Sequence, residues 1–148
     1  EKAGFAQLQT LADRVDVHPA NRESSAAQLM LGFCYSMCVG APKKDLAEAV
    51  KWWRKAAEQG DSYAQLTVGN CFSEGRGVAE DAQQGVVWWK KDAEQGEVEA
   101  QFNLWKAFDK GVGVEKNEQR AAELHQSLQR MSTENDTWAH RAVKALEV

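Results

Sequence analysis

Small and apolar residues recur early in the chain at the spacing of one buried helix face. Ala27, Leu31 and Tyr35 lie four positions apart. Spacings of three and four residues bring side chains to one side of an α-helix. The pattern therefore predicts a helix over about 24–37, and Ser24 is a residue type that caps helix N-termini well.

A second stripe with helical spacing follows after a loop. Trp52, Trp53 and Ala56 lie on one side of a helix that we predict over about 45–59. Gly60 comes next, and glycine commonly ends a helix because it adopts positive φ without a steric penalty. We interpret the large aromatic residues of this stripe as core, because apolar periodicity is typical of burial.

This pair of helices is repeated along the chain. Ala27, Ala64 and Ala100 each begin an Ala-Gln-apolar triplet, at offsets of 37 and 36 residues. The Trp-Trp pair at 52–53 recurs at 88–89 with an offset of 36. Landmarks that share one period indicate an array of helix-pair repeats. The three repeats span about 24–60, 61–96 and 97–132.

A glycine-containing loop joins the two helices of a repeat. Gly-Arg-Gly-Val at 75–78 matches Gly-Val-Gly-Val at 111–114, and the one extra residue of the first repeat falls between Gly40 and Trp52. A phosphate-binding loop would need a preceding strand and further glycines or a lysine at fixed offsets. Because a helix precedes both loops, we interpret them as structural connections.

Helices of non-repeat sequence are expected at both ends. Apolar residues at helical spacing occur over about 3–15, including Phe5, and over about 136–147, including Trp138. Such terminal helices cover the apolar faces that the end repeats would otherwise expose. We therefore predict an all-α fold in a single domain over 1–148. It is an α-α superhelical solenoid of three helix pairs with N- and C-terminal capping helices, about eight helices in all.

Composition narrows the class of protein. The net charge is -4 with dispersed basic residues, so we expect no nucleic-acid partner. The mean hydropathy is -0.57, and no apolar run approaches the roughly 18 residues of a membrane span. We expect a soluble protein without a membrane span. Because the chain begins at Glu1 rather than Met, we also expect that a signal peptide or another N-terminal segment has been removed.

Candidate catalytic and metal-binding residues form no recognisable group. For Cys34, Cys38 and Cys71 we expect free thiols, with a disulfide or a metal site as less favoured alternatives. His125 replaces a repeat tryptophan, so we interpret it as half-buried structure. Acidic residues are spread along polar helix faces, with no recurring pair suited to acid–base work. We therefore predict no enzyme activity, no metal and no cofactor.

The motifs resemble those of a known repeat family. The first repeat reads A-Q-x-x-L-G-x-x-Y from residue 27 and W-W-R-K-A-A-E-Q-G-D from residue 52. This pattern is similar to the Sel-one-like repeat (SLR), a branch of the tetratricopeptide-like helical solenoids. The resemblance covers about 24–132 in three copies. It implies a scaffold for protein interaction.

The departures from the family pattern carry predictions of their own. Cys38 stands where the family has the first glycine of the loop. Trp105 stands where the first two repeats have a helix glycine, and Leu124 and His125 replace the Trp pair of the third repeat. We interpret the second set as an exchange of volume that keeps the core filled, with one large ring gained where two are lost.

The resemblance implies that partners are recognised on a concave face, at first-helix positions away from the buried stripe. Each repeat supplies three such positions: the first trio is apolar, the second polar and the third basic. This gradation suits a partner with an apolar anchor at one end and an acidic patch at the other. The alternative is that the helix over 3–15 covers Met30 and Phe33. The predicted partner-binding residues are Met30, Phe33, Met37, Thr67, Asn70, Glu74, Asn103, Lys106 and Lys110.

The expected partner is another protein, such as a secreted effector or an envelope complex. The most concrete function that the resemblance implies is a non-catalytic bacterial adaptor, or an immunity-type protein that neutralises a secreted toxin such as a lipase-type effector. We favour the periplasm over the cytoplasm. Two alternatives stay open at this point: a cell-wall- or ester-active enzyme of the cysteine-rich branch, and a self-associating structural repeat.

Overall fold

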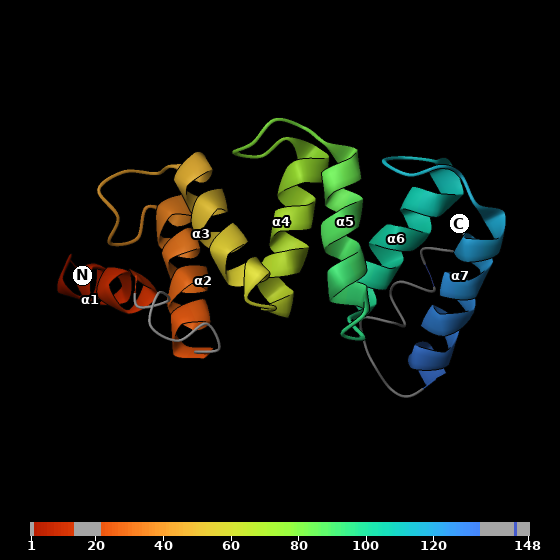
Figure 1. Ribbon diagram of the computed structural model, residues 1–148, viewed down its shortest axis with the longest axis horizontal. Coiled ribbons are helices and arrows are strands. Elements are labelled where there is room, and N and C mark those ends of the chain that lie inside the picture. The colour runs from red at the N-terminus through yellow and green to blue at the C-terminus, as the bar shows by residue number, and fades with distance from the viewer. Residues whose placement is uncertain (1, 14–21, 134–143, 145–148) are drawn as a thin grey trace.

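The computed structural model describes residues 2–13, 22–133 and 144, and within these ranges the chain is helical with no strand. The helices stand side by side in a row that begins at the N-terminal helix (Figure 1). The bounds are α1 (Lys2–Ala12), α2 (Arg22–Met37), α3 (Leu46–Glu58), α4 (Ser62–Glu74), α5 (Ala82–Ala93), α6 (Val98–Lys110) and α7 (Glu118–Thr133).

Each helix packs against the next one in sequence, from α1 to α7. The pairs α2–α3, α4–α5 and α6–α7 are the three predicted repeats, and α1 is the predicted N-terminal cap. The all-α solenoid of helix pairs is therefore confirmed. The predicted C-terminal cap over 136–147 lies outside the described residues, except for position 144.

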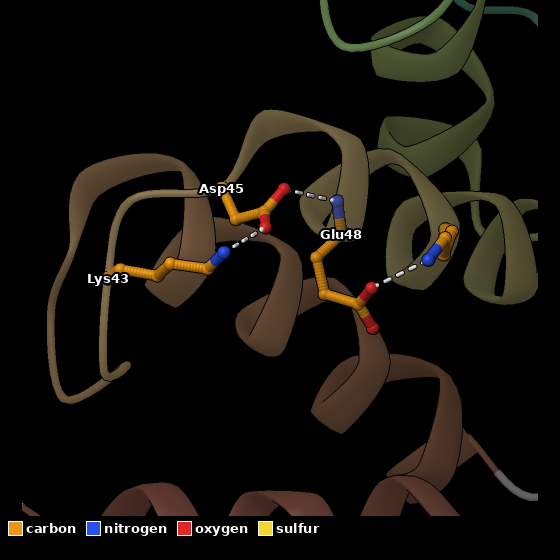
Figure 2. Close-up of polar contacts among 4 residues, drawn as sticks. Lys43, Asp45 and Glu48 are labelled. Carbon is orange, nitrogen blue, oxygen red and sulfur yellow. Dashed lines mark hydrogen bonds and ion pairs between the residues drawn. The ribbon is translucent and has the colours of Figure 1, made fainter.

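Aspartate side chains cap the N-termini of three helices. Asp45, Asp61 and Asp81 each accept a hydrogen bond from the backbone N–H three residues further on, at 3.0, 2.8 and 3.0 Å. Figure 2 shows Asp45, which also pairs with Lys43 at 3.4 Å. The hydrogen bond from the backbone of Glu48 lowers the pKa of Asp45, and Lys43 lowers it further. Such caps satisfy N–H groups that the helix itself leaves unpaired.

The expectation that Ser24 caps a helix is wrong. The helix α2 begins at Arg22, so Ser24 lies within its first turn. The Ser24 side chain is 1% exposed, and its hydroxyl donates to the carbonyl oxygen of Ala12 at 3.3 Å. The serine therefore joins α2 to the capping helix α1 instead of starting α2.

Each repeat closes its longer loop in the same way. The N–H of Asp45 donates to the carbonyl oxygen of Tyr35 at 2.9 Å, and that of Asp81 donates to Phe72 at 2.8 Å. The first loop residue is left-handed in every repeat: φ is +59° at Cys38, and it is +64° and +68° at the two equivalent glycines. These residues end their helices in the conformation that favours glycine.

The two tryptophans of a pair pack in different directions along the solenoid. Trp52 packs with the preceding helices α1 and α2, and Trp53 packs in the cluster that α3 forms with α4. One repeat later, Trp88 packs back into that α3–α4 cluster, and Trp89 packs with α6. Leu124, at the position of Trp88, likewise packs back against the cluster of Trp89. The tryptophans therefore form the core that joins one repeat to the next.

The second tryptophan of a pair lies against a glycine on the first helix of its repeat. A Cβ atom on Gly69 would lie 2.6 Å from Cδ1 of Trp89, and a Cβ atom on Gly32 would collide with Trp53. Real Cβ atoms do not approach so closely, because cores have almost no spare volume. A larger residue thus fits this position only where no tryptophan faces it.

The third repeat meets that condition. Trp105 replaces the glycine, and His125 stands at the position of the facing tryptophan. Trp105 is half-buried and stacks on Phe102, with 5.7 Å between ring centroids and 25° between the ring planes. The close packing of glycine and tryptophan in the other repeats supplies a physical reason for the predicted exchange of volume.

A buried glutamine links three helices in each of the first two repeats. Gln65 on α4 accepts from Nε2 of Gln95 at 2.8 Å and donates to the carbonyl oxygen of Ala57 at 3.1 Å. One repeat earlier, Gln28 accepts from Gln59 at 2.6 Å and donates to the last carbonyl of α1 at 3.1 Å. These glutamines donate to carbonyl groups at helix ends, where the helix leaves its last carbonyls without the usual intrahelical partner.

Candidate functional site

The nine predicted partner-binding residues lie on α2, α4 and α6, the first helices of the three repeats. Each trio occupies the same positions in its repeat, and we call the set the first-helix face. The structure gives its three parts different properties, because some of these side chains are exposed and others are used within the protein.

The apolar part of the first-helix face combines exposed and half-buried side chains. Met30 is 50% exposed and Met37 is 64% exposed. Phe33 is half-buried: its ring meets Trp53 edge-on at 5.5 Å and lies 5.8 Å from the ring of Tyr63. The prediction that Phe33 stands apart from the core is therefore wrong, because this ring packs on a core tryptophan.

Sequence reasoning missed Tyr63, which is 57% exposed in the first turn of α4. It belongs to the second repeat, so the comparison of equivalent positions did not place it beside Phe33. A large aromatic residue at an exposed helix start was the signal that could have found it. Met30 lies three residues before Phe33 on the same face of α2, and the ring of Phe33 lies beside that of Tyr63. We call these three residues the apolar cluster.

The capping helix α1 does not cover Met30. Its residues Phe5, Leu8 and Leu11 pack instead on the cluster that contains Leu31 and Trp52. That cluster belongs to the buried stripe of α2, whereas Met30 remains half exposed. The alternative in which α1 covers Met30 and Phe33 is therefore not what the structure shows: Met30 is half exposed, and the ring of Phe33 meets Trp53 and Tyr63.

The polar trio on α4 is largely engaged within the protein. The Thr67 hydroxyl donates to the carbonyl oxygen of Tyr63 at 2.8 Å. Asn70 Oδ1 accepts from the Trp89 indole at 3.0 Å. Glu74 is exposed and pairs with Arg76 at 2.7 Å. Of this trio, Glu74 is the exposed side chain available to a partner.

The basic trio on α6 divides into one buried and two more accessible residues. Asn103 is 8% exposed, contrary to its prediction as a contact residue, and it donates to Asn70 at 3.3 Å. Lys106 is half-buried, with its Nζ atom 4.9 Å from the centre of the Phe102 ring. Lys110 is exposed in the last turn of α6. The two lysines keep positive charge at this end of the face.

Asp92 on α5 is a buried carboxyl group that sequence reasoning missed. It is 0% exposed; its Oδ1 accepts from the Ser62 hydroxyl, and its Oδ2 has no hydrogen-bond partner in the described ranges. Burial raises the pKa of Asp92 to about 6, and nearby acidic residues raise it while the Ser62 hydrogen bond lowers it. The expectation that acidic residues lie on polar helix faces is wrong here. The signal was the alignment of Asp92 with Ala56 and Leu128.

The three cysteines are free thiols, as expected. Burial raises the pKa of both Cys71 and Cys34, whereas Cys38 is exposed. Within the described part of the chain, no three His, Cys, Asp or Glu side chains gather in a way that could hold a metal ion. No helix in that part is long and apolar enough to cross a membrane.

The fold and the first-helix face define a class: a solenoid of antiparallel helix pairs that presents an extended surface made from equivalent positions. A family model described as "Sel1 repeat" matches residues 25–61, 62–97 and 98–127. The chain therefore belongs to the Sel1 repeat family, whose members generally act as protein-interaction modules.

Solved structures of bacterial SLR proteins resemble this chain. One is a protective antigen of uropathogenic Escherichia coli strains that displays an SLR fold; it is 34% identical, with a TM-score of 0.69 over 82% of this chain and 26% of its own. The present chain thus spans about a quarter of the length of that antigen. A Sel1 repeat protein from Oxalobacter formigenes is 26% identical, with a TM-score of 0.74 over 96% of this chain and 98% of its own. Among curated proteins, none matches the chain.

Proposed function

We propose that this chain binds another protein, without catalysing a reaction, through its first-helix face. The observation that carries the proposal is the apolar cluster, in which Met30 and Tyr63 are 50% and 57% exposed beside the ring of Phe33. Adjacent exposed apolar side chains typically mark an interface. Aromatic residues in such a position often supply most of the binding energy.

The most concrete form of the proposal is a bacterial adaptor or an immunity-type protein that blocks a secreted toxin, such as a lipase-type effector, in the periplasm. The organisms of the two structural relatives, Escherichia coli and Oxalobacter formigenes, support the bacterial setting. A compact array of three repeats also suits an inhibitor that acts by occupying a surface.

A binding comparison tests the general proposal. The Met30→Ser/Tyr63→Ser double variant removes two exposed apolar contacts and leaves Phe33 on Trp53. If both residues are hot spots, each costs at least about 2 kcal/mol, and the affinity for the native partner falls roughly a hundredfold or more. The measurement is quantitative capture of the partner from cells of the source organism, followed by titration with the purified partner.

The matched control is Val87→Ser on α5, which also replaces an apolar residue that is 44% exposed. The control should bind as the parent chain does, and both variants should keep the parent's melting temperature. Equal capture by all three proteins would contradict the proposed face.

The immunity form requires more than binding. The captured partner should hydrolyse an ester substrate alone and lose that activity when an equimolar amount of this chain is added. A partner that keeps its full activity would favour the adaptor form. Cell fractionation of the source organism tests the periplasmic setting.

A further inference from the structure

A pocket opens at the basic end of the first-helix face. Its volume is about 190 Å³, and it lies between α4, α5 and α6. An enclosed apolar cavity of roughly 150 Å³ is large enough to hold benzene. The pocket is therefore large enough for one apolar side chain. The lining includes Trp89, Asn103, Lys106, Ala107, Lys110 and Val112.

The repeat comparison explains why the pocket occurs beside Trp89. In the first repeat, the ring of Phe33 packs on the equivalent tryptophan, Trp53, at 5.5 Å. In the second repeat the position of Phe33 is taken by Asn70, which accepts from the Trp89 indole at 3.0 Å. An asparagine occupies less space than a phenylalanine ring, so no aromatic ring from α4 covers this side of Trp89.

The pocket has an apolar part, which includes Trp89 and Val112, and a basic part formed by two lysines. Trp89 lies on α5, and Val112, 51% exposed, follows α6. Lys106 and Lys110 lie one turn apart on α6, and neither has a described carboxylate within ion-pair distance. The charge of Lys106 does act on Glu99: burial raises the pKa of that carboxyl group, and Lys106 lowers it. Two such lysines at one apolar pocket stand out in a chain whose net charge is -4.

We propose that this pocket binds an extended segment of a partner protein in which an apolar residue stands between two Asp or Glu residues. The apolar side chain enters beside Trp89, and the two carboxylates pair with Lys106 and Lys110. This inference rests on the proposed function, because it names the chemistry of the partner at the end of the face opposite the apolar cluster.

The spacing of the lysines supports the acid–apolar–acid pattern. Four residues of α-helix rise about 6 Å, and alternate residues of an extended strand lie about 6.7 Å apart. Successive side chains of a strand point in opposite directions. An extended segment along α6 therefore directs both acids toward the lysines and the residue between them toward α5 and Trp89.

Labelled synthetic peptides test the proposal by fluorescence anisotropy with the full chain. The probe contains Glu-Phe-Glu between Gly-Ser ends, and two comparison peptides contain Lys-Phe-Lys or Glu-Ala-Glu. We expect saturable binding of Glu-Phe-Glu, which weakens when NaCl is raised from about 50 mM to about 500 mM. The comparison peptides should bind at least roughly tenfold more weakly.

The protein variants locate the binding. The Lys106→Gln/Lys110→Gln variant should bind the Glu-Phe-Glu peptide roughly tenfold more weakly than the parent chain does, since exposed ion pairs contribute modestly to affinity. Lys43→Gln/Lys44→Gln removes the same charge from the loop before α3 and should leave binding unchanged. In NMR spectra, the peptide should shift the indole N–H signal of Trp89 and leave that of Trp52 in place.

Specific results would overturn the proposal. The proposal fails if the Glu-Phe-Glu peptide does not bind saturably, or if the three peptides bind equally well. It also fails if the two double variants change binding equally, or if the peptide leaves the Trp89 indole signal unshifted. A native partner that depends on Met30 and Tyr63, with no binding of Glu-Phe-Glu, would remove this inference and leave the proposed function standing. Glu-Phe-Glu binding without any capture of a native partner would contradict the proposed function and, with it, the assignment of the pocket to a partner segment.

Discussion

Asp92 holds a carboxyl group at a position where the other two repeats have buried apolar residues, Ala56 and Leu128, each 0% exposed. Removing a carboxylate from water disfavours its charged form, which is why its pKa rises to about 6. The folded state then binds this proton more tightly than the unfolded chain does. Stability from Asp92 is therefore present at low pH and is lost as the pH rises through about 4 to 6.

We predict that Asp92→Asn raises the stability of the protein at pH 7.5. A pKa raised from 3.8 to about 6 corresponds to a penalty on the order of 3 kcal/mol at neutral pH, at about 1.4 kcal/mol per pH unit. The buried amide nitrogen offsets part of this gain. Denaturant unfolding between pH 4 and pH 7.5 measures the difference between the variant and the parent, which should grow with pH. The exposed Asp109→Asn is the control, and the same pH trend in both variants would contradict the prediction.

Cys38 is a second residue whose contribution to stability depends on its local structure, in this case the backbone conformation. Its φ of +59° makes it the sole non-glycine residue with positive φ in the described ranges. The left-handed conformation costs an L-residue roughly 1–2 kcal/mol, and part of this is offset because glycine loses more entropy on folding. We predict that Cys38→Gly stabilises the protein by about 0.5–1 kcal/mol, which raises the melting temperature by a few degrees. Cys38→Ser removes the thiol but keeps the strain, so a gain in that variant would contradict the explanation.

At the scale of the helices, buried glutamines join neighbouring elements by hydrogen bonds. Gln28 and Gln65 are 1% and 5% exposed, and each bonds to the last turn of the preceding helix and to a glutamine just after the following helix. The third repeat has Met131 at the position of the second glutamine, and the Ser127 hydroxyl bonds to Gln101 at 2.9 Å instead. The same polar link is thus formed by a different residue of the same helix.

We predict that Gln65→Ala destabilises the protein by about 1–3 kcal/mol, because it removes two buried hydrogen bonds, one to the Ala57 carbonyl and one from the Gln95 amide. Chemical denaturation measures the loss. Gln83→Ala, at an exposed position on α5, should change stability by no more than about 0.5 kcal/mol. Equal effects of the two substitutions would show that the buried link contributes nothing.

At the scale of the whole molecule, stability depends on neighbouring units, because each helix packs mainly against the next. The capping helix α1 covers Ala27, Leu31 and Trp52 with its partly buried side chains. It also accepts hydrogen bonds from Ser24 and Gln28 at its last residue. The end of the solenoid therefore needs α1 for both apolar and polar reasons.

We predict that deletion of residues 1–13 lowers the free energy of unfolding by at least about 3 kcal/mol, since full burial of one large apolar side chain contributes roughly 1.5–3 kcal/mol. The newly exposed α2 face should bind a hydrophobic dye and promote association at high concentration. Calorimetry and light scattering measure the two effects. Gln7→Ala on the exposed side of α1 is the control, and an unchanged melting temperature after the deletion would contradict the role of α1 as a cap.

The sequence by itself determined the helices, their pairing and their repetition. Periodic apolar positions and glycine loops are local signals, and they recur at one offset, so errors in one repeat are corrected by the others. The same comparison placed the Trp pairs in the core. It also marked Cys38 as a residue that replaces a loop glycine, and the structure shows that this residue has positive φ.

The tertiary structure alone decided which face residues are free. Asn103 shares its register position with Met30, which is 50% exposed, yet Asn103 is buried and bonds to Asn70. Phe33 lies one helical turn from Met30, yet its ring packs on Trp53. Helical spacing in the sequence predicts on which side of its own helix a residue lies. The solvent exposure of its side chain depends also on the side chains of the neighbouring helices. Tyr63 joined Phe33 for the same reason, since contact between repeats follows from how two helices pack and not from their equivalent positions.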